Sequence, residues 1–284
     1  MAKLIDGKKI SAAVKDSVRA EINSLKEKGI EACLAVIIVG DDPASQIYVA
    51  NKERACEYTG IRSLKFALPA TTTMEELLAL IEKLNADKTV NGILCQLPLP
   101  KGLDEQAVID AISPLKDVDA FHPVNVGKIM TGNFDFLPCT PAGIMEMLDY
   151  EGIEIEGKPC VVIGRSNIVG KPMSMLLLHK NGTVTVCHSR TKNLKEVTKS
   201  ADILVSAVGK ANFVTADMVK KGAVVIDVGM NRDENGKLCG DVLFSEVEPI
   251  SSAITPVPGG VGPMTISVLM KNTLTATKKQ NNII

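Results

Sequence analysis

The chain has 284 residues, of which 45% are hydrophobic and 23% charged, and its net charge at pH 7 is −1. This length allows one large or two medium domains with a substantial buried core. The balanced charge excludes the basic surface by which proteins bind nucleic acids or anionic membranes. No apolar run approaches the ~20 residues that span a bilayer, and the N-terminus lacks the apolar stretch of a signal peptide. We therefore expect a cytoplasmic protein with no nucleic-acid or membrane partner.

The seven cysteines are scattered along the chain and never stand in a Cys-x-x-Cys spacing. An odd number without a pairing pattern is typical of a reducing compartment, and it argues against a disulfide framework or a zinc site. We therefore predict no metal.

Apolar runs alternate with helical patterns along most of the chain. Strands are predicted at 33–39, 63–68, 92–97, 160–163, 184–188, 203–207 and 223–227. Helices are predicted at 43–58, 74–85, 104–112, 171–180, 194–200 and 216–221. This alternation predicts an α/β protein with parallel sheets and helices on both faces.

The polar stretch between Pro114 and Pro141 breaks the alternation and shows no strong periodicity. We place a domain boundary there, near residue 140. The expected organisation is one lobe of residues 1–140, completed by a C-terminal helix at 270–284, and a second lobe of residues 141–269. The active site is expected in the cleft between them.

The segment 255–265 contains three prolines and three glycines in eleven residues. Proline lacks a backbone donor and glycine has the largest backbone entropy, so we expect neither helix nor paired strand over this stretch. Apolar segments on both sides would hold it in place, and its glycines would let backbone amides approach a ligand. Pro263 stands where a helix could start. The alternative is an ordinary interdomain loop.

A second glycine-bearing segment follows the strand at 160–163. Gly164 and Gly170 enclose a turn that leads into the helix at 171–180. Such a turn aims the amides of a helix N-terminus at a pyrophosphate. Because only two glycines are present, a plain strand-to-helix connection explains the spacing about as well, although the flanking elements stand where a dinucleotide-binding motif requires them.

The next strand bears on the identity of the nucleotide. NAD enzymes usually carry an acidic residue at the end of this strand to bind the ribose 2′-hydroxyl. Here the strand ends in His188-Ser189-Arg190-Thr191-Lys192, which contains no acid. A hydroxyl and basic groups suit a 2′-phosphate, which Arg165 could also reach. We therefore favour NADP over NAD, with a solvated basic turn as the alternative.

Polar residues suited to catalysis stand in the first half. Tyr48 and Lys52 are four apart and share a helix face, whose register Asp42 and Pro43 set as N-cap and first helical residue. A lone pair of this kind is usually a surface pair. Gln96, however, lies at the carboxyl end of a buried strand, where ligands bind in open α/β sheets. The acidic segment 116–122 lies outside regular structure, and a solvated turn is its alternative interpretation.

Together these segments resemble the bifunctional methylenetetrahydrofolate dehydrogenase/cyclohydrolase family. The matching motifs follow the family's order from end to end of the chain, and the last, at 256–265, is highly specific. The others lie at 40–45 leading to Tyr48 and Lys52, 96–100, 116–119, 164–166 and 169–172. One departure is Ala120, where the family usually has glycine. Its methyl group costs little unless this residue needs a positive φ.

The resemblance implies a substrate, 5,10-methylenetetrahydrofolate, that loses a hydride to NADP and becomes a methenyl cation. Water then attacks the cation, and ring opening gives 10-formyltetrahydrofolate. These steps belong to one-carbon metabolism, the tetrahydrofolate interconversions that supply purine biosynthesis. The implied fold has two lobes, each a mostly parallel sheet flanked by helices, the second a Rossmann-like NADP-binding domain. The family is homodimeric, and the strands at 184–187 and 203–207 could supply a sheet edge for such a dimer.

The resemblance also implies residue roles. A lysine beside a substrate cation is disfavoured in its charged form, so Lys52 would be driven toward the neutral amine and could take a proton from the attacking water. Gln96 would hold Lys52 by a hydrogen bond, Tyr48 would lie against the folate rings, and Asp119 could accept two N–H bonds from the pterin. These four residues are the expected catalytic set. The expected folate-binding residues are Tyr48, Pro98, Asp119, Gly259, Gly260 and Pro263, and the expected NADP-binding residues are Gly164, Arg165, Ser166, Ser189 and Met230.

Three alternatives stay open from the sequence. Another two-domain NADP dehydrogenase, acting for example on a shikimate-like acid, would share the cofactor turn but would not need Tyr48, Lys52 and Gln96 in one cluster. A catalytically silent nucleotide-binding scaffold would have no reason to retain a lysine at a strand end. A monofunctional dehydrogenase of the same family is the nearest alternative, and the presence of both Lys52 and Gln96 argues against it.

Overall fold

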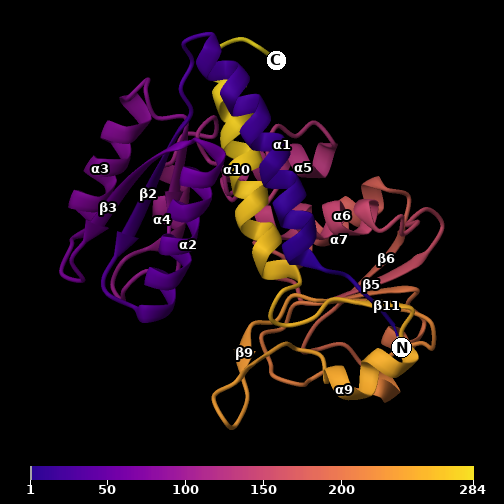
Figure 1. Ribbon diagram of the computed structural model, residues 1–284. Coiled ribbons are helices and arrows are strands. Elements are labelled where there is room, and N and C mark those ends of the chain that lie inside the picture. Colours follow the sequence, from indigo (N-terminus) through magenta and orange to yellow (C-terminus); the bar gives the residue numbers. More distant parts are fainter. Residues whose placement is uncertain (1) are drawn as a thin grey trace. The chain divides into compact units, whose positions relative to one another are not determined.

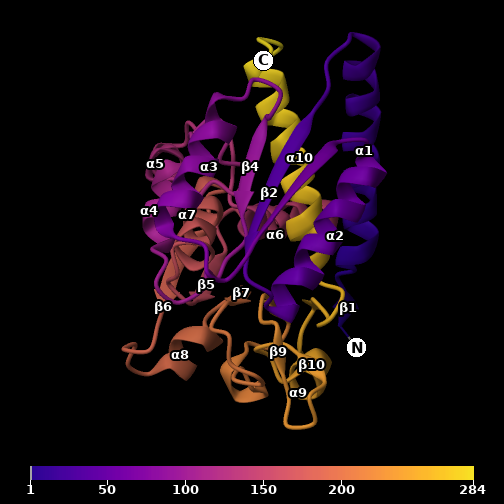
Figure 2. The same cartoon turned by 90° about the vertical axis from the view of Figure 1, so that its left-hand side faces the viewer.

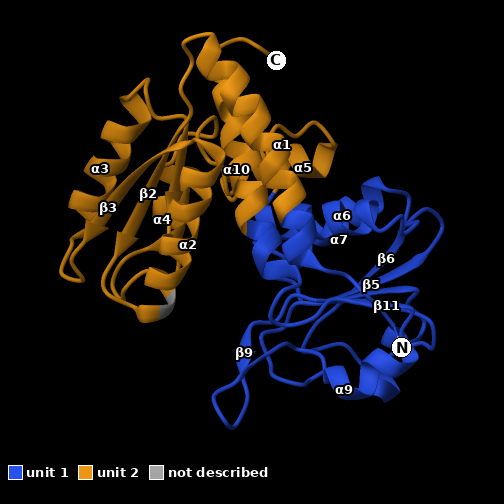
Figure 3. Ribbon diagram, in the orientation of Figure 1, with its two compact units in different colours: residues 1–11, 138–265 blue, residues 12–137, 266–284 orange. Residues whose placement is uncertain are grey.

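The computed structural model of the protein describes residues 2–284, apart from the side chain of Ala44 (Figure 1). The chain forms two compact units (Figure 3). Unit 1 comprises Pro138–Thr265 and the N-terminal segment that ends at Ser11. Unit 2 comprises Ala12–Leu137 and Ile266–Ile284. The N-terminal segment therefore belongs to unit 1, and not to the lobe in which we expected it.

Unit 2 is built on a three-stranded parallel sheet in the order β3 (Arg62–Leu68), β2 (Cys33–Val39), β4 (Gly92–Cys95). Helix α2 (Pro43–Thr59) covers one face, and α3 (Met74–Ala86) and α4 (Glu105–Ala111) cover the other (Figures 1 and 2). Opposite faces follow from right-handed crossovers, because β3 and β4 pair on opposite sides of β2. Every residue of β2 is buried, as expected for a central strand with both faces covered.

The predicted helix starts in unit 2 are confirmed. The Asp42 carboxylate accepts a hydrogen bond of 2.8 Å from Ser45 N, Pro43 is the first helical residue, and the helix ends at Gly60 with φ +79°. Thr73 and Glu76 form a capping box at the start of α3. One strand is shorter than predicted: β4 ends at Cys95, which leaves Gln96 in the following loop.

Unit 1 contains a six-stranded sheet in which every neighbouring pair is parallel. Its order is β1 (Lys3–Leu4), β11 (Ala253–Ile254), β8 (Val224–Asp227), β7 (Ile203–Ser206), β5 (Pro159–Ile163), β6 (Thr183–Cys187). From β5 the chain goes first to β6 on one side and then to β7 on the other. Ligands bind in open α/β sheets at such a switch point, outside the carboxyl ends of the strands.

Helices cover both faces of this sheet as well. α6 (Cys139–Tyr150) and α7 (Gly170–His179) lie on one face, and α8 (Leu194–Lys199) and α9 (Phe244–Val247) lie on the other (Figures 1 and 2). The predicted helix at 216–221 is a single 3₁₀ turn, η1 (Ala216–Met218). The predicted strand at 203–207 cannot supply a sheet edge, because β7 lies between β5 and β8; β6 is at an edge.

Several elements were not predicted. α1 (Gly7–Glu27) buries Ile10, Val18, Ile22 and Leu25 along one face. The region expected to lack regular structure contains α5 (Pro123–Thr131). His122 is the N-cap of this helix, and its Nδ1 accepts a hydrogen bond from Val124 N. The remaining short elements are β9 (Asn231–Arg232), β10 (Leu238–Cys239) and η2 (Glu248–Ile250).

The C-terminal helix α10 (Val261–Gln280) begins well before residue 270 and close to Pro263, where the sequence allowed a helix to start. Our expectation that no helix forms within 255–265 is wrong for its last five residues. Pro263 fits because the first N–H groups of a helix have no partner within it, so a missing donor costs nothing there. Within residues 2–284, no helix has both the length and the apolar composition that crossing a bilayer requires.

Candidate functional site

The pair of Lys52 and Gln96 is the centre of the candidate site in unit 2. Lys52 stands on α2, which begins shortly after the carboxyl end of β2, and Gln96 directly follows β4. Because β2 and β4 are parallel neighbours, both carboxyl ends lie at one edge of the sheet. The Lys52 ammonium nitrogen Nζ donates to Oε1 of Gln96 over 2.8 Å, and both side chains are half-buried. The expected contact between these two residues is therefore present.

The other half of the Gln96 amide fixes its orientation. Nε2 donates to the Leu97 carbonyl over 2.6 Å, and the backbone N–H of Gln96 donates to the Ile37 carbonyl over 2.8 Å. With Nε2 directed at a carbonyl, Oε1 is the atom that faces Lys52. An amide oxygen accepts from an amine in either protonation state, so this pair keeps its geometry whether Lys52 is charged or neutral.

Tyr48 and Asp119 lie in the same unit. Tyr48 is one helical turn before Lys52 on α2, and burial raises the pKa of its hydroxyl group. Burial also raises the pKa of Cys95 to about 12, with the charge of Asp119 adding to the rise and that of Lys52 opposing it. Both charged groups therefore lie within electrostatic range of the carboxyl end of β4. Pro98 follows in the next loop and is exposed.

The segment before Asp119 is held from several directions. The interpretation of 116–122 as a solvated turn is wrong for Lys116 and Asp117, which are 7% and 3% exposed. Lys116 donates to the carbonyls of Leu84 and Asp87 at the end of α3, over 2.8 and 2.6 Å, so it stabilises a helix C-terminus. Burial lowers the pKa of Lys116 and raises that of Asp117.

The backbone carbonyls of 114–118 all accept hydrogen bonds from neighbouring elements or from the turn itself. The donors are Asn125 to Pro114, Gln280 to Leu115, Ile93 N to Lys116, Ala120 N to Asp117 and Asn272 to Val118, over 2.8 to 3.1 Å. Two of these side chains, Asn272 and Gln280, come from α10. The sequence analysis did not identify them. The half-exposed Asp119 is thus presented by a fully bonded loop.

In the predicted cofactor turn of unit 1, close packing of the backbone requires glycine at two positions. Gly164 has φ +127°, and a Cβ there would overlap the carbonyl group of Ala207, which directly follows β7. A Cβ at Gly170 would overlap the backbone of Gly164. The Ser166 hydroxyl accepts from the N–H groups of Val169 and Gly170 over 3.2 and 3.3 Å. The turn is therefore tight, and it packs against the loop that follows the carboxyl end of β7.

The basic turn after β6 is also ordered by its own side chains. Thr191 Oγ1 accepts from His188 N over 2.8 Å, and His188 Nδ1 accepts from Arg190 N over 3.1 Å. Ser189 and Arg190 consequently point outward and are exposed, as is Arg165 in the first turn. Met230, in the loop after β8, is 47% exposed. These exposed groups surround the switch point between β5 and β7 at the carboxyl edge of the sheet.

Two buried aspartates in unit 1 were missed by the sequence analysis. Asp227, at the end of β8, and Asp241 are 3% and 0% exposed. Burial raises the pKa of Asp227 to about 6, against the opposing effect of hydrogen bonds from the backbone of Val242, Asp241 and Gly229. An aspartate closing a buried strand was the signal available for Asp227.

The glycines of the segment 255–263 belong to unit 1 and also have packing reasons. Gly259 has φ +108°, and a Cβ at Gly260 would press on the Pro256 carbonyl and the Thr255 side chain. A Cβ at Gly7, the first residue of α1, would overlap the Gly260 carbonyl. Pro263 accepts a hydrogen bond of 3.0 Å at its carbonyl from the Ser11 hydroxyl. The segment is therefore held, as predicted.

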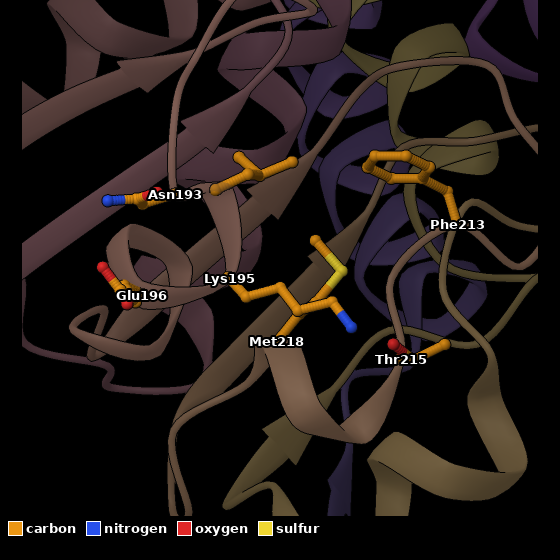
Figure 4. Close-up of a pocket in the computed structure, with 7 residues that line it drawn as sticks. Asn193, Lys195, Glu196, Phe213, Thr215 and Met218 are labelled. Atoms are coloured by element: carbon orange, nitrogen blue, oxygen red, sulfur yellow. The ribbon is translucent and has the colours of Figure 1, made fainter.

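Unit 1 also has a cavity of about 470 Å³ between α8 and η1, lined by Asn193, Leu194, Lys195, Glu196, Phe213, Thr215 and Met218 (Figure 4). Lys195 forms an ion pair with Asp217 beside it. None of the predicted site residues lines this cavity, so it is separate from the cofactor turn.

Comparison with known proteins identifies the family. The family model described as tetrahydrofolate dehydrogenase/cyclohydrolase, catalytic domain, matches residues 5–119, and the NAD(P)-binding domain of the same family matches residues 138–281. The chain is 62% identical to the bifunctional protein FolD of Agathobacter rectalis over 279 residues, which cover 98% of this chain and 100% of that protein. This chain belongs to the tetrahydrofolate dehydrogenase/cyclohydrolase family.

Solved structures of this family agree with the fold. The bifunctional FolD enzyme of Campylobacter jejuni superposes with a TM-score of 0.96 at 52% identity, covering 98% of this chain and 99% of that one. The Trypanosoma brucei dehydrogenase-cyclohydrolase, solved with NADP and an inhibitor, gives 0.93 at 40% identity, covering 98% of both chains. The expected family and the expected α/β fold with a Rossmann-like NAD(P)-binding domain are confirmed. The alternative of another dehydrogenase family is wrong.

Ala120 departs from the glycine that the tetrahydrofolate dehydrogenase/cyclohydrolase family usually has there, and its φ of +58° shows that the position does need the left-handed conformation. The residue is fully buried. We expect Ala120→Gly to change stability by less than about 1 kcal/mol, because relief of strain offsets the lost methyl burial and the added chain entropy. Ala120→Val should cost about 2–3 kcal/mol, since a β-branched side chain disfavours the positive φ and adds volume at a fully buried position.

Urea unfolding of the three proteins measures these differences. A valine variant as stable as the wild type would show that residue 120, directly after Asp119, is not held in the left-handed conformation.

Proposed function

We propose that this protein catalyses two consecutive reactions of one-carbon metabolism. It oxidises 5,10-methylenetetrahydrofolate to 5,10-methenyltetrahydrofolate with NADP, and it hydrolyses the product to 10-formyltetrahydrofolate. The observation that carries this proposal is the 2.8 Å hydrogen bond between Lys52 and Gln96 at the carboxyl edge of the unit 2 sheet. This hydrogen bond holds the Lys52 amine in a defined position, in a chain that belongs to the dehydrogenase/cyclohydrolase family.

Lys52 is the proton-handling residue of the hydrolysis in this proposal. The methenyl group is cationic, and a cation beside an amine favours the neutral amine. Neutral Lys52 accepts a proton from the water that attacks the methenyl carbon. Gln96 Oε1 keeps the amine in place before and after the proton is transferred. Tyr48 packs against the folate rings, with Pro98 in the neighbouring loop.

Asp119 is proposed to bind the pterin. A carboxylate accepts two parallel N–H bonds from an aminopyrimidine edge, and this recognition requires a fixed carboxylate. The hydrogen bonds to the carbonyls of 114–118 hold the segment before Asp119 in place. Gly259, Gly260 and Pro263, in a segment held by its own close packing, are proposed as further folate contacts.

NADP fits the residues at the switch point of unit 1. Gly164 and Gly170 leave the turn free of side chains, Ser166 orders the start of α7, and the exposed Arg165 and Ser189 suit a 2′-phosphate. Met230 is proposed to contact the nicotinamide end. Bound NADP supplies the hydride acceptor. The protein needs no acid or base for this step, only the alignment of the two rings.

We further propose a homodimer and a cytoplasmic location. β6 is an edge strand of the unit 1 sheet, and its Thr183, Thr185 and Val186 are exposed, so it can pair with a second copy. All seven cysteines are free thiols, which suits a reducing compartment.

Lys52→Met is expected to lower the hydrolysis of methenyltetrahydrofolate by about 10²–10⁴-fold, the usual contribution of general acid–base catalysis. Methionine keeps the length of the stem, so the fold should survive. Oxidation of methylenetetrahydrofolate should fall much less, because hydride transfer needs no proton from the protein. Absorbance of the methenyl species and of reduced NADP follows the two steps separately.

Lys65→Met serves as the matched control, since Lys65 is in the same unit and pairs with Glu53 at the surface. Full hydrolysis by Lys52→Met would contradict the mechanism. A wild-type protein that only oxidises the substrate would be a monofunctional dehydrogenase.

Arg165→Ala is expected to raise the KM for NADP by about 10–100-fold, as the loss of hydrogen bonds to a charged group predicts. The KM for NAD should change little, because NAD lacks the 2′-phosphate. Steady-state kinetics with each nucleotide test this, with Arg232→Ala as control, since Arg232 is exposed in the same unit. Equal effects on both nucleotides would show that Arg165 does not bind the 2′-phosphate.

The dimer is tested by light scattering at micromolar concentration. The wild type should have twice the mass of the chain, and Val186→Asp should be a monomer, because a charge on an edge strand blocks pairing. Leu238→Asp, at an exposed position of the β9–β10 hairpin, should stay dimeric. A monomeric wild type would overturn the proposal.

A further inference from the structure

Asp241 is a buried carboxylate near the edge of the unit 1 sheet at which the strands have their carboxyl ends. Asp241 is 0% exposed and accepts five hydrogen bonds. Four come from the end of β7 and its following loop: the Ser206 hydroxyl at 3.1 Å and the N–H groups of Val208, Gly209 and Lys210 at 2.7, 3.3 and 2.9 Å. The fifth comes from the Asn231 side chain, after β8, at 3.0 Å. One side chain thus joins the loops of two neighbouring strands.

The loop after β7 lies against the dinucleotide turn. Ala207 N donates to the Ile163 carbonyl over 2.8 Å, and the Ala207 carbonyl occupies the place of a Cβ at Gly164. A shift of this loop would therefore displace the turn that follows β5. The loop after β8 carries Met230, the residue before Asn231.

A second carboxylate holds the first. Asp227 accepts from Gly229 N, Asp241 N and Val242 N, each over 2.9 Å. Glycines make room for both groups, because a Cβ at Gly229 would overlap Asp241 and a Cβ at Gly240 would overlap Asp227. Because these groups are closely packed, the Asp241 side chain has little room to move.

We propose that Asp241 is a positioning residue for NADP, which holds the loops after β7 and β8 against the dinucleotide-binding turn. The inference rests on the proposed binding of NADP by unit 1. Three successive N–H groups that converge on one point form an anion-binding arrangement. Here Asp241 occupies it, so the amides of 208–210 face away from the nucleotide phosphates. The phosphates are left to the turn that follows β5.

The test is Asp241→Asn, which keeps the volume but directs N–H groups at converging donors. The dissociation constant for NADP, measured by calorimetry without folate, should rise about 10–100-fold. Hydrolysis of methenyltetrahydrofolate, measured without NADP, should stay within about twofold, because Lys52, Gln96 and Tyr48, the residues proposed for this step, lie in unit 2 and none of them is among the donors to Asp241. Asp233→Asn is the matched control: Asp233 also accepts two backbone N–H bonds in unit 1, in the β9–β10 hairpin. Unchanged NADP affinity, or a parallel loss of both properties, would overturn the proposal.

A milder variant and the wild type keep the proposal testable if Asp241→Asn does not fold. Asn231→Ala removes one of the five bonds and should weaken NADP binding by a smaller factor. In the wild type, the amides of Val208, Gly209 and Lys210 should already be protected from exchange with solvent deuterium without NADP, because Asp241 binds them in the free protein. Fast exchange of these amides without NADP, with protection only once NADP is bound, would show that they bind the nucleotide and not Asp241, which contradicts the inference.

These measurements also separate the inference from the proposed function. A wild type that binds NADP but neither oxidises nor hydrolyses folates would end the proposed function and leave the Asp241 test intact. A wild type that does not bind NADP would overturn both.

Discussion

Parallel strand pairing is the constraint on which both units depend. After each strand the chain must cross back over a face of the sheet before the next parallel strand begins. The loops that follow the strands therefore all lie at the same edge of the sheet. Gln96 and the start of α2 come together in this way in unit 2. The turn at Gly164 and the loop after β7 do so in unit 1. The candidate site residues are therefore concentrated at two sheet edges.

Loops have no ladder to hold them, and polar side chains from other elements supply the missing hydrogen bonds. Asn125, Asn272 and Gln280 donate to the carbonyls before Asp119. Asp241 accepts from the N–H groups after β7. In both places an unpaired backbone group would cost free energy, and the bond that satisfies it also fixes a neighbouring candidate site residue or turn. Order in these loops thus comes from residues that need not touch a ligand.

Glycine has the complementary role of allowing segments to approach. At Gly164, Gly170 and Gly260 an added Cβ would overlap a backbone group of the protein itself. The glycines that suggested ligand contact from the sequence are required by internal packing. The two explanations are compatible, because a segment packed without side chains also leaves backbone accessible on its other side.

The sequence by itself determined the local features: the alternation of strands and helices, the cap at Asp42, and the motifs that identify the family. These depend on residues close in the chain, whose spacing and capping chemistry can be read directly. The helices α1 and α5, the early start of α10 and the end of β4 escaped prediction, because packing and the first-turn tolerance for proline set them. Only the tertiary structure decided that Ala120 needs a positive φ, that Lys116 caps α3 and that Asp241 joins two loops. Each of these rests on contacts between residues far apart in sequence, which appear only when the strands are in register.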